Sequence, residues 1–278
     1  MDDQRNDLAR LIATRRVVFF RDQDDFDIEA QRDLGRYFGT LHRHATTAMP
    51  KKARLEDVHV VYTGHNSVDQ RALFSPRFLW HSDVTYEVQP PSYTSLMVLT
   101  GPPRGGGEGG KDITTHANIP EGLTALNSAD MQADGSRAAG RPVRREPITT
   151  EHPLILTNPV TGWNSLFFNP GFGTKIVEVP NLESDAIISY LNSVVATTTL
   201  LRITLYLSPA QTNSDLKPKN HTASYGFAPH RRHAVRVACH AERPSFDPLG
   251  KSQEEELAAK YNIPLVNKDG SLPSNYND

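Results

Sequence analysis

Short segments rich in β-branched and aromatic residues recur along the whole chain, and helical patterns flank them without alternating with them. Such segments predict strands at residues 17–20, 58–62, 92–100, 200–207 and 233–239, and a hairpin over 153–169 with its turn at 158–162. Many strands with helices outside them favour a β-rich α+β fold, either a jelly roll or a sandwich.

Four helices are predicted from apolar residues at helical spacing and from capping residues. They cover residues 7–13 behind an Asn6 or Asp7 N-cap, 27–38 ending at Gly39, 181–195 beginning at Asn181, and 252–261. Residues 120–127 are also expected to be helical, and the arginine-rich residues 131–150 are expected to form a long polar excursion. The glycine cluster at 104–110 lacks the pattern of a phosphate loop and predicts a turn.

The composition excludes several functional classes. Of the 278 residues, 37% are hydrophobic and 22% are charged, which is typical of a globular protein. A formal net charge of −2 gives no general attraction to nucleic acid or to anionic membranes. The sequence has no apolar run of the roughly 18 residues that a membrane helix needs, and its N-terminus lacks the apolar core of a signal peptide. A single cysteine, Cys239, fits a reducing compartment, so we expect a cytoplasmic protein with Cys239 in its core.

Trp80-His81-Ser82-Asp83 carries the clearest chemical signal in the chain. On an extended segment, His81 and Asp83 would point to the same side. Two histidines and one carboxylate form the facial triad of open iron(II) sites, so this pair would supply two of the three ligands. Because His-x-Asp is a frequent pattern, an ordinary polar pair is the alternative unless a third ligand exists.

A candidate for the third ligand opens the basic segment 221–236. Arg232 follows His221 by eleven residues, and Arg236 follows it by fifteen. A guanidinium binds a carboxylate through two hydrogen bonds, which suits a 2-oxo acid whose far carboxylate needs a cation. A basic surface strand is the alternative. The histidines without a spaced partner are expected to be surface or structural residues: His59, His65, His116, His152 and His240.

Several motifs occur in a characteristic order: residues 17–23 (VVFFRDQ), 39–44 (GTLHRH), 80–87 (WHSDVTYE), 90–91 (PP), 152–153 (HP), 158–163 (NPVTGW) and 221–236. Together they resemble the TauD/TfdA (taurine dioxygenase-like) family of Fe(II)- and 2-oxoglutarate-dependent oxygenases, most of all its fungal sulfonate-dioxygenase-like members. The resemblance implies one dioxygenase domain over residues 1–278, with a double-stranded β-helix (jelly-roll) core and flanking helices.

The resemblance also implies the residues that hold the cofactors. The iron ligands, which form the predicted catalytic set, would be His81, Asp83 and His221. Arg232 would pair with the distal carboxylate of 2-oxoglutarate, assisted by Thr114 or, as an alternative, by Thr115. Dioxygen would be the second co-substrate.

By the same resemblance, His44, Arg236 and the backbone N–H of Val84 would contact the anionic group of the substrate. A cationic contact of this kind suits a sulfonate such as taurine, a sulfate ester or a carboxylate. Hydroxylation of this small substrate would release succinate and CO2. Further candidates for the pocket wall, each expected to be structural instead, are Phe74, Arg77 and Tyr86.

The sequence departs from the family pattern in three places. It is expected to be shortened near residues 110–120 and at the N-terminus, and residues 213–220 replace a Trp-Asp-Asn-Arg motif. Pro218 in that segment cannot donate to a strand ladder. Two alternatives therefore stay open: a non-catalytic relative that acts as a binding subunit, and a tailoring oxygenase of secondary metabolism. Apolar surface left by a missing helix would favour a homo-oligomer.

Overall fold

The computed structural model describes residues 2–15, 17–51, 54–64, 81–100, 121–197, 204–207 and 231–262. The helices are α1 (Asp2–Arg15), α2 (Ile28–Phe38), α4 (Asp130–Ala138), α5 (Asn181–Thr197) and α6 (Gln253–Tyr261). The first five strands are β1 (Val17–Phe20), β2 (Val58–Thr63), β3 (Pro91–Thr100), β4 (Thr124–Ser128) and β5 (Thr149–Pro153). The others are β6 (Ile155–Thr157), β7 (Asn164–Leu166), β8 (Gly173–Ile176), β9 (Thr204–Leu207) and β10 (Arg232–His240).

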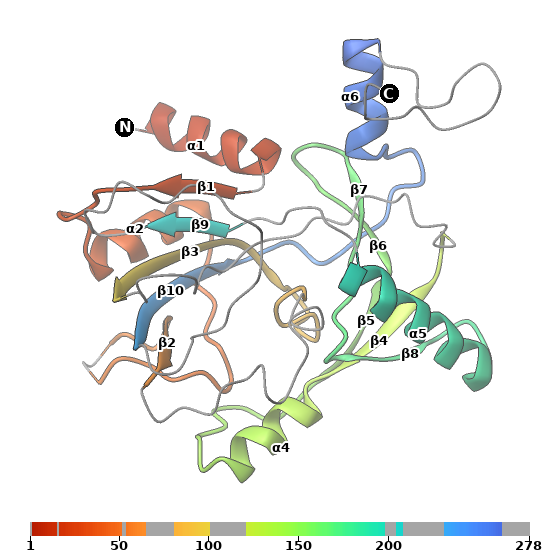
Figure 1. Ribbon diagram of the computed structural model, residues 1–278, viewed down its shortest axis with the longest axis horizontal. Coiled ribbons are helices and arrows are strands. Elements are labelled where there is room, and N and C mark those ends of the chain that lie inside the picture. Colours follow the sequence, from red (N-terminus) through yellow and green to blue (C-terminus); the bar gives the residue numbers. More distant parts are fainter. Residues whose placement is uncertain are drawn as a thin grey trace.

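A five-stranded sheet in the order β1-β9-β3-β10-β2 forms one half of the described structure. The strand β9 pairs in parallel with both β1 and β3, whereas β10 pairs antiparallel with β3 and β2. Helices α1 and α2 cover one face of this sheet (Figure 1). The opposite face is the one that carries the polar residues described below.

The strand β10 separates these two faces by simple alternation, because successive side chains of a strand point to opposite sides. Val235 and Val237 pack into the cluster beneath α1 and α2, together with Val58 and Met97 of the neighbouring strands. The close approach of α2 depends on Gly35, because a Cβ atom there would lie 2.9 Å from the Cγ1 atom of Val237. Arg236, which lies between Val235 and Val237 on β10, therefore faces away from the helices.

A second, three-stranded sheet in the order β5-β4-β8 forms the other half, next to the hairpin β6-β7. Helix α5 lies across this region (Figure 1) and places Leu191 and Val195 in the apolar cluster beneath it. That cluster also contains Ala125 of β4, Leu166 of β7 and Ile176 of β8. The two halves thus have separate apolar cores, and polar residues lie between the sheets.

Most of the predicted elements are confirmed, including the hairpin at 153–169 and the helices at 27–38, 181–195 and 252–261. Residue Asp27 caps α2 by accepting from the backbone N–H of Ala30 at 2.8 Å. Ser252 and Glu255 form a capping box at the start of α6. Local capping chemistry therefore sets these helix starts.

Three predictions about local structure are wrong. The helix expected at 120–127 is strand β4 in its described part, because that segment pairs with β5 and β8. The excursion expected at 131–150 contains α4 and the start of β5. The first helix begins at Asp2, so neither Asn6 nor Asp7 is its N-cap.

The described residues form an α+β fold with helices packed outside the sheets, as predicted. None of the helices in the described ranges is long and apolar enough to cross a membrane. Cys239 is fully buried, which confirms its predicted place in the core.

Candidate active site

His81 and Asp83 precede β3, at the start of a turn that lies between the two sheets, where Figure 1 draws it as a gold coil. The second sheet holds this turn through three hydrogen bonds. They run from Thr85 Oγ1 to Asn127 Oδ1 (2.8 Å), from Thr150 Oγ1 to the carbonyl of Tyr86 (3.0 Å), and between His152 Nε2 and the carbonyl of Glu87 (2.7 Å). Asn169 also donates to the carbonyl of Ser82. The buried His152 is thus structural, as predicted.

The prediction that His81 and Asp83 lie on an extended segment is wrong, because residues 83–86 form a turn. The backbone N–H of Glu87 donates to the carbonyl of Val84 at 2.9 Å, which tightens the chain directly after Asp83. Ser82 between the two predicted ligands is buried, whereas His81 is exposed and Asp83 is 33% exposed.

Val84 has a φ of 40°, a left-handed backbone conformation that is unusual for a β-branched residue. Its side chain is fully buried beside Tyr86 and Ala129. This burial holds the strained backbone in place, at a cost of about 1–3 kcal/mol. Tyr86 is also buried, and its hydroxyl donates to Gln132 at 2.5 Å, so its expected structural role fits the structure.

Asp83 forms an ion pair with Arg236, whose Nη1 atom lies 2.5 Å from Asp83 Oδ2. Burial raises the pKa of the Asp83 carboxyl, but the positive charge of Arg236, with smaller contributions from His44 and His81, outweighs that effect and lowers the pKa below its ordinary value. Asp83 therefore stays ionised at neutral pH and presents a hard anionic oxygen ligand.

His59, which sequence analysis did not single out, also contacts Arg236. The two residues are directly opposite in the antiparallel pairing of β2 with β10. His59 Nδ1 lies 3.3 Å from Arg236 Nε and 3.1 Å from Arg236 Nη2. The His59 ring is 1% exposed, and its Nε2 atom lies 3.2 Å from the carbonyl oxygen of His42.

His44 is buried next to this group, with ring centroids of His44 and His59 5.4 Å apart. Its Nδ1 atom accepts hydrogen bonds from the backbone N–H groups of Thr46 at 3.1 Å and Thr47 at 3.3 Å. Burial lowers the pKa of His44 to about 4, and the charge of Arg236 acts in the same direction. His44 is therefore neutral at pH 7, with its proton on Nε2, and can donate one hydrogen bond.

Arg232 is 2% exposed and lies four residues before Arg236 on β10, so the two side chains leave the same face of the sheet. The spacing corresponds to about 13 Å along the strand. The predicted site residues His221 and Thr114 lie outside the described residues, as do Thr115, Phe74 and Arg77. Within the described ranges, no group of three or more His, Cys, Asp or Glu side chains is arranged to hold a metal ion.

The donors that the structure does describe fit iron(II) as part of a ligand set. His81 and Asp83 supply an imidazole and an ionised carboxylate from one short segment, and this combination suits a non-haem iron centre. The third predicted donor, His221, is outside the described residues.

Glu87 lies four residues after Asp83 and has a second arginine as its partner. Arg145 Nη1 donates to Glu87 Oε2 at 2.9 Å, and Arg145 Nη2 contacts Oε1. His42 Nε2 lies 3.2 Å from the same Oε1 atom. Burial raises the pKa of Glu87, but the hydrogen bonds with His42 and Arg145 outweigh it and lower the pKa.

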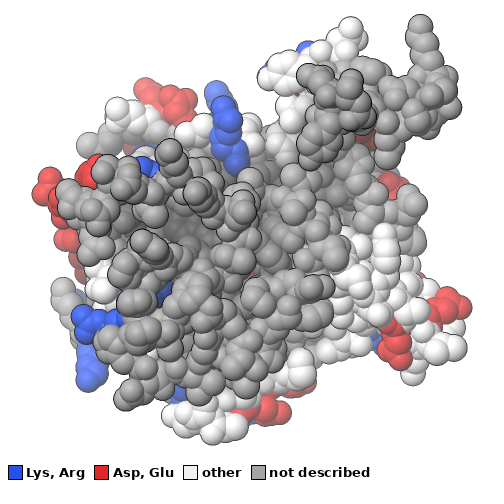
Figure 2. All heavy atoms as spheres, in the orientation of Figure 1, with Lys and Arg blue, Asp and Glu red and all other residues white. Residues whose placement is uncertain are grey.

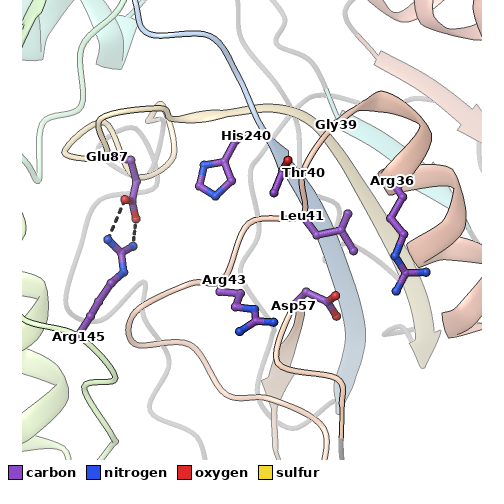
Figure 3. Close-up of a pocket in the computed structure, with 9 residues that line it drawn as sticks. All are labelled: Arg36, Gly39, Thr40, Leu41, Arg43, Asp57, Glu87, Arg145 and His240. Carbon is purple, nitrogen blue, oxygen red and sulfur yellow. Dashed lines mark hydrogen bonds and ion pairs between the residues drawn. The ribbon is translucent and has the colours of Figure 1, made fainter.

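A cavity of about 940 Å³ borders this second pair, and Figure 3 shows the Arg145 guanidinium facing Glu87 at its edge. Its lining consists of Arg36, Gly39, Thr40, Leu41, Arg43, Asp57, Glu87, Arg145 and His240. Among the described residues, none that is predicted to bind iron, 2-oxoglutarate or substrate lines it. On the face of the molecule in Figure 2, the acidic and basic side chains of described residues are scattered along the outline of the molecule and do not form a patch of one sign.

Comparison with known proteins identifies the family. The family model for the taurine catabolism dioxygenases TauD, TfdA matches residues 1–204. The chain belongs to this family. Membership implies iron(II), 2-oxoglutarate and dioxygen, and it confirms the predicted family and enzyme class.

Relatives of this TauD-family chain include two yeast proteins. A Schizosaccharomyces pombe protein assigned as an alpha-ketoglutarate-dependent sulfonate dioxygenase is 36% identical over 92% of this chain and 68% of its own length. The alpha-ketoglutarate-dependent sulfonate dioxygenase of Saccharomyces cerevisiae is 32% identical over 88% of this chain and 63% of its own length. The chain thus spans about two thirds of each relative.

Two solved structures share the fold. One is a Burkholderia xenovorans protein assigned as an alpha-ketoglutarate-dependent taurine dioxygenase, with a TM-score of 0.53 and 20% identity over 81% of this chain and 78% of that chain. The other is AAD-2 in complex with Mn(II) and N-oxalylglycine, with a TM-score of 0.51 and 15% identity over 79% of this chain and 83% of that chain.

Proposed function

We propose that this chain is an Fe(II)- and 2-oxoglutarate-dependent dioxygenase that hydroxylates a small organic sulfonate. The proposal rests on the close arrangement of Asp83, Arg236 and His44 on the face of the first sheet that is turned away from α1 and α2. An ionised carboxylate, a guanidinium and a neutral histidine there combine one metal ligand with two groups that bind an anion. The names of the two yeast relatives support the sulfonate as substrate class.

Iron(II) would be held by His81 and Asp83, together with His221. When bound with 2-oxoglutarate and dioxygen, it supplies the oxidising chemistry that hydroxylates a carbon of the substrate and releases succinate and CO2. The turn from Ser82 to Glu87 would keep His81 and Asp83 in place for this role, because β4 and β5 hold it by hydrogen bonds.

Arg232 would bind the distal carboxylate of 2-oxoglutarate, with Thr114 as its assistant. A guanidinium buried to 2% exposure suits this role, because ionic hydrogen bonds are stronger when water is excluded. The distance of about 13 Å between positions 232 and 236 on the strand gives the co-substrate and the substrate separate cationic partners.

Arg236 and His44 would bind the sulfonate of the substrate, with the backbone N–H of Val84 as a further donor. The guanidinium supplies charge and a two-pronged contact, and neutral His44 adds an N–H without a second full charge. With the sulfonate bound there, the carbon next to it would lie near Asp83, because Arg236 contacts Asp83. Hydroxylation of that carbon would yield an aldehyde and sulfite.

We also propose that the sheets are parts of one jelly-roll domain that extends over residues 1–278. The likeness to two solved structures at TM-scores of 0.53 and 0.51 supports this finer assignment of the fold. Strand β9 pairs in parallel with β1 and β3, so the first sheet is mixed, and the jelly-roll assignment has to include this mixed sheet.

The decisive test is turnover by the purified protein with iron(II), 2-oxoglutarate, oxygen and a panel of sulfonates, sulfate esters and carboxylates. We expect succinate formation that depends on a sulfonate, with sulfite in equal amount, and that is lost in His81→Ala. Succinate that forms only with carboxylates would contradict the sulfonate assignment. Absence of succinate with every compound, together with no iron binding at micromolar metal, would refute the enzymatic function.

A further inference from the structure

The guanidinium of Arg236 is held along one edge by a single imidazole nitrogen. His59 Nδ1 lies 3.3 Å from Nε and 3.1 Å from Nη2, so it faces the Nε–Nη2 edge of the planar group. The opposite end is directed at Asp83, 2.5 Å from Nη1. Leu96 is in register with Arg236 on the other neighbouring strand and is fully buried. On the neighbouring strands, Arg236 is thus flanked by His59 on one side and by the buried Leu96 on the other.

The chemistry of these contacts determines the state of His59. A guanidinium has only donors, so His59 Nδ1 must be an unprotonated acceptor. The ring proton then resides on Nε2 and is donated to the carbonyl oxygen of His42, 3.2 Å away. Burial of His59 and the neighbouring charge of Arg236 both lower the pKa of His59 well below its ordinary value, which agrees with a neutral ring.

We infer that His59 is a positioning residue for substrate recognition: its Nδ1 fixes the orientation of the Arg236 guanidinium, so that the Nη1–Nη2 end meets the anionic group beside Asp83. This inference rests on the proposed function. Fixing a long, flexible arginine in advance reduces the conformational entropy lost on binding. It also fixes the angle of approach, which favours an anion that offers two coplanar oxygens to the fork.

Two amide substitutions separate the two nitrogens of His59. In His59→Asn, the side-chain oxygen occupies the position of Nδ1 and can still accept from Arg236, whereas the donor to the His42 carbonyl is lost. In His59→Gln, the amide nitrogen reaches the position of Nε2 and keeps that donor, whereas the acceptor for Arg236 is lost. His233→Gln is the matched control, because His233 is on the same strand as Arg236 but on the opposite face of the sheet, where its ring lies edge-on to Tyr62.

The measurement is the Kd of taurine or another accepted sulfonate for protein loaded with Mn(II) and N-oxalylglycine, followed by calorimetry without turnover, alongside KM and kcat of the iron-loaded enzyme. We expect His59→Gln to raise Kd and KM by about 10-fold or more, the order expected for a lost hydrogen bond to a charged group, with kcat changed much less. His59→Asn is expected to stay within about 3-fold of wild type, since its acceptor is retained. His233→Gln should match wild type.

The outcomes distinguish this inference from the proposed function. Equal losses in both variants, or losses in N-oxalylglycine binding as large as those in sulfonate binding, would indicate a merely structural His59 and overturn the inference. Unchanged sulfonate affinity in His59→Gln would overturn it as well, while an active wild-type enzyme would leave the proposed function standing. A wild-type protein that neither binds a sulfonate nor forms succinate would overturn both.

Discussion

Asp83 and Glu87 lie four residues apart on one turn, and each faces an arginine with a buried histidine nearby. The Glu87 side chain is 6% exposed and has the Arg145 guanidinium on both oxygens and His42 on one of them. The Asp83 side chain is 33% exposed, and Arg236 lies at its Oδ2 atom. Both carboxyl groups have a lowered pKa, so ionisation alone does not separate them.

The difference lies in what each carboxylate is able to do. The oxygens of Glu87 are engaged by side chains from other segments, which joins the turn to residues 42 and 145 and makes this pair structural. Asp83 is more open, directly precedes the strained Val84 and lies two residues after the predicted ligand His81. Similar pairs of residues therefore have different roles because their exposure and surroundings differ.

The largest contrast is expected from removing the two carboxylates in turn. Asp83→Ala should reduce succinate formation by more than about 100-fold, because even residues that only orient metal ligands change affinity or activity about 10–100-fold. The melting temperature should change little, since the Asp83 side chain is partly exposed. Substantial turnover by Asp83→Ala, measured with saturating iron(II), would show that this carboxylate is not a ligand.

Of the two arginine partners, Arg236 is the one whose removal should impair the reaction. Arg236→Leu is expected to raise the KM for a sulfonate by about 10–100-fold, because a hydrogen bond to a charged group contributes about 1.5–3 kcal/mol. Binding of 2-oxoglutarate, measured separately, should be retained because Arg232 is a different residue on the same strand. The exposed Arg137→Leu serves as the control for loss of a positive charge. If Arg236→Leu raised the KM for the sulfonate and the KM for 2-oxoglutarate equally, Arg236 would lie outside the substrate site.

Sequence analysis predicted the strands that carry this site because their β-branched residues are dense and local. Residues 58–62 and 233–239 appear as β2 and β10 with small shifts of their ends. Residues 124–128 (TALNS) carry little β-branched character, and they form strand β4 because β5 and β8 pair with them. Such pairing is a tertiary effect that overrides local propensity.

The site was predictable only where residues fall into short motifs. His81 and Asp83 are two residues apart, whereas the contact between His59 and Arg236 joins positions 177 residues apart in the sequence. A usable signal did exist: Val58 and Val60 alternate with His59, which places a lone polar side chain on the face away from the helices. Knowing that β2 pairs with β10 in this register was the missing step.

The titration of His44, which lies beside the Asp83–Arg236 pair, should make the free energy of unfolding depend on pH. Because the pKa of His44 is about 4 when folded and about 6.5 when unfolded, the unfolded chain binds this proton first as the pH falls. Stability should therefore decrease between about pH 6.5 and pH 4. The share of His44 amounts to about 2 kcal/mol between pH 7 and pH 5.

His44→Asn tests this, because the asparagine oxygen can still accept from the N–H groups of Thr46 and Thr47. Urea unfolding of metal-free protein at pH 7 and pH 5 should show a smaller loss in the variant. The buried His59 contributes with the same sign and stays in both proteins, so the difference between the two proteins reports His44 alone. An identical loss in wild type and variant would mean that His44 is protonated in the folded protein at pH 5.

The smallest effect is expected on the structural side of the comparison. Glu87→Gln keeps the shape of the side chain and one acceptor oxygen, but it replaces charged hydrogen bonds with Arg145 and His42 by neutral ones. Because Arg145 is itself about one third exposed, we expect a loss of only about 1–2 kcal/mol in the free energy of unfolding at pH 7. The exposed Glu146→Gln, whose carboxylate lies 3.7 Å from Arg137, should change stability by less than about 0.5 kcal/mol.

The lowered pKa of Glu87 determines how the stability difference between wild type and Glu87→Gln should change with pH. A carboxyl whose pKa is lowered by folding stabilises the protein above its ordinary pKa of about 4.3, and this contribution is lost as the pH falls through the folded pKa. The difference in unfolding free energy between wild type and Glu87→Gln should therefore be constant from pH 7 to pH 5 and shrink below about pH 4.3. His44 acts above that range, so the two carboxylate environments can be separated by pH alone. A Glu87→Gln variant that loses turnover at unchanged stability would reverse the comparison, since Glu87 would then belong to the chemistry and not to the frame around it.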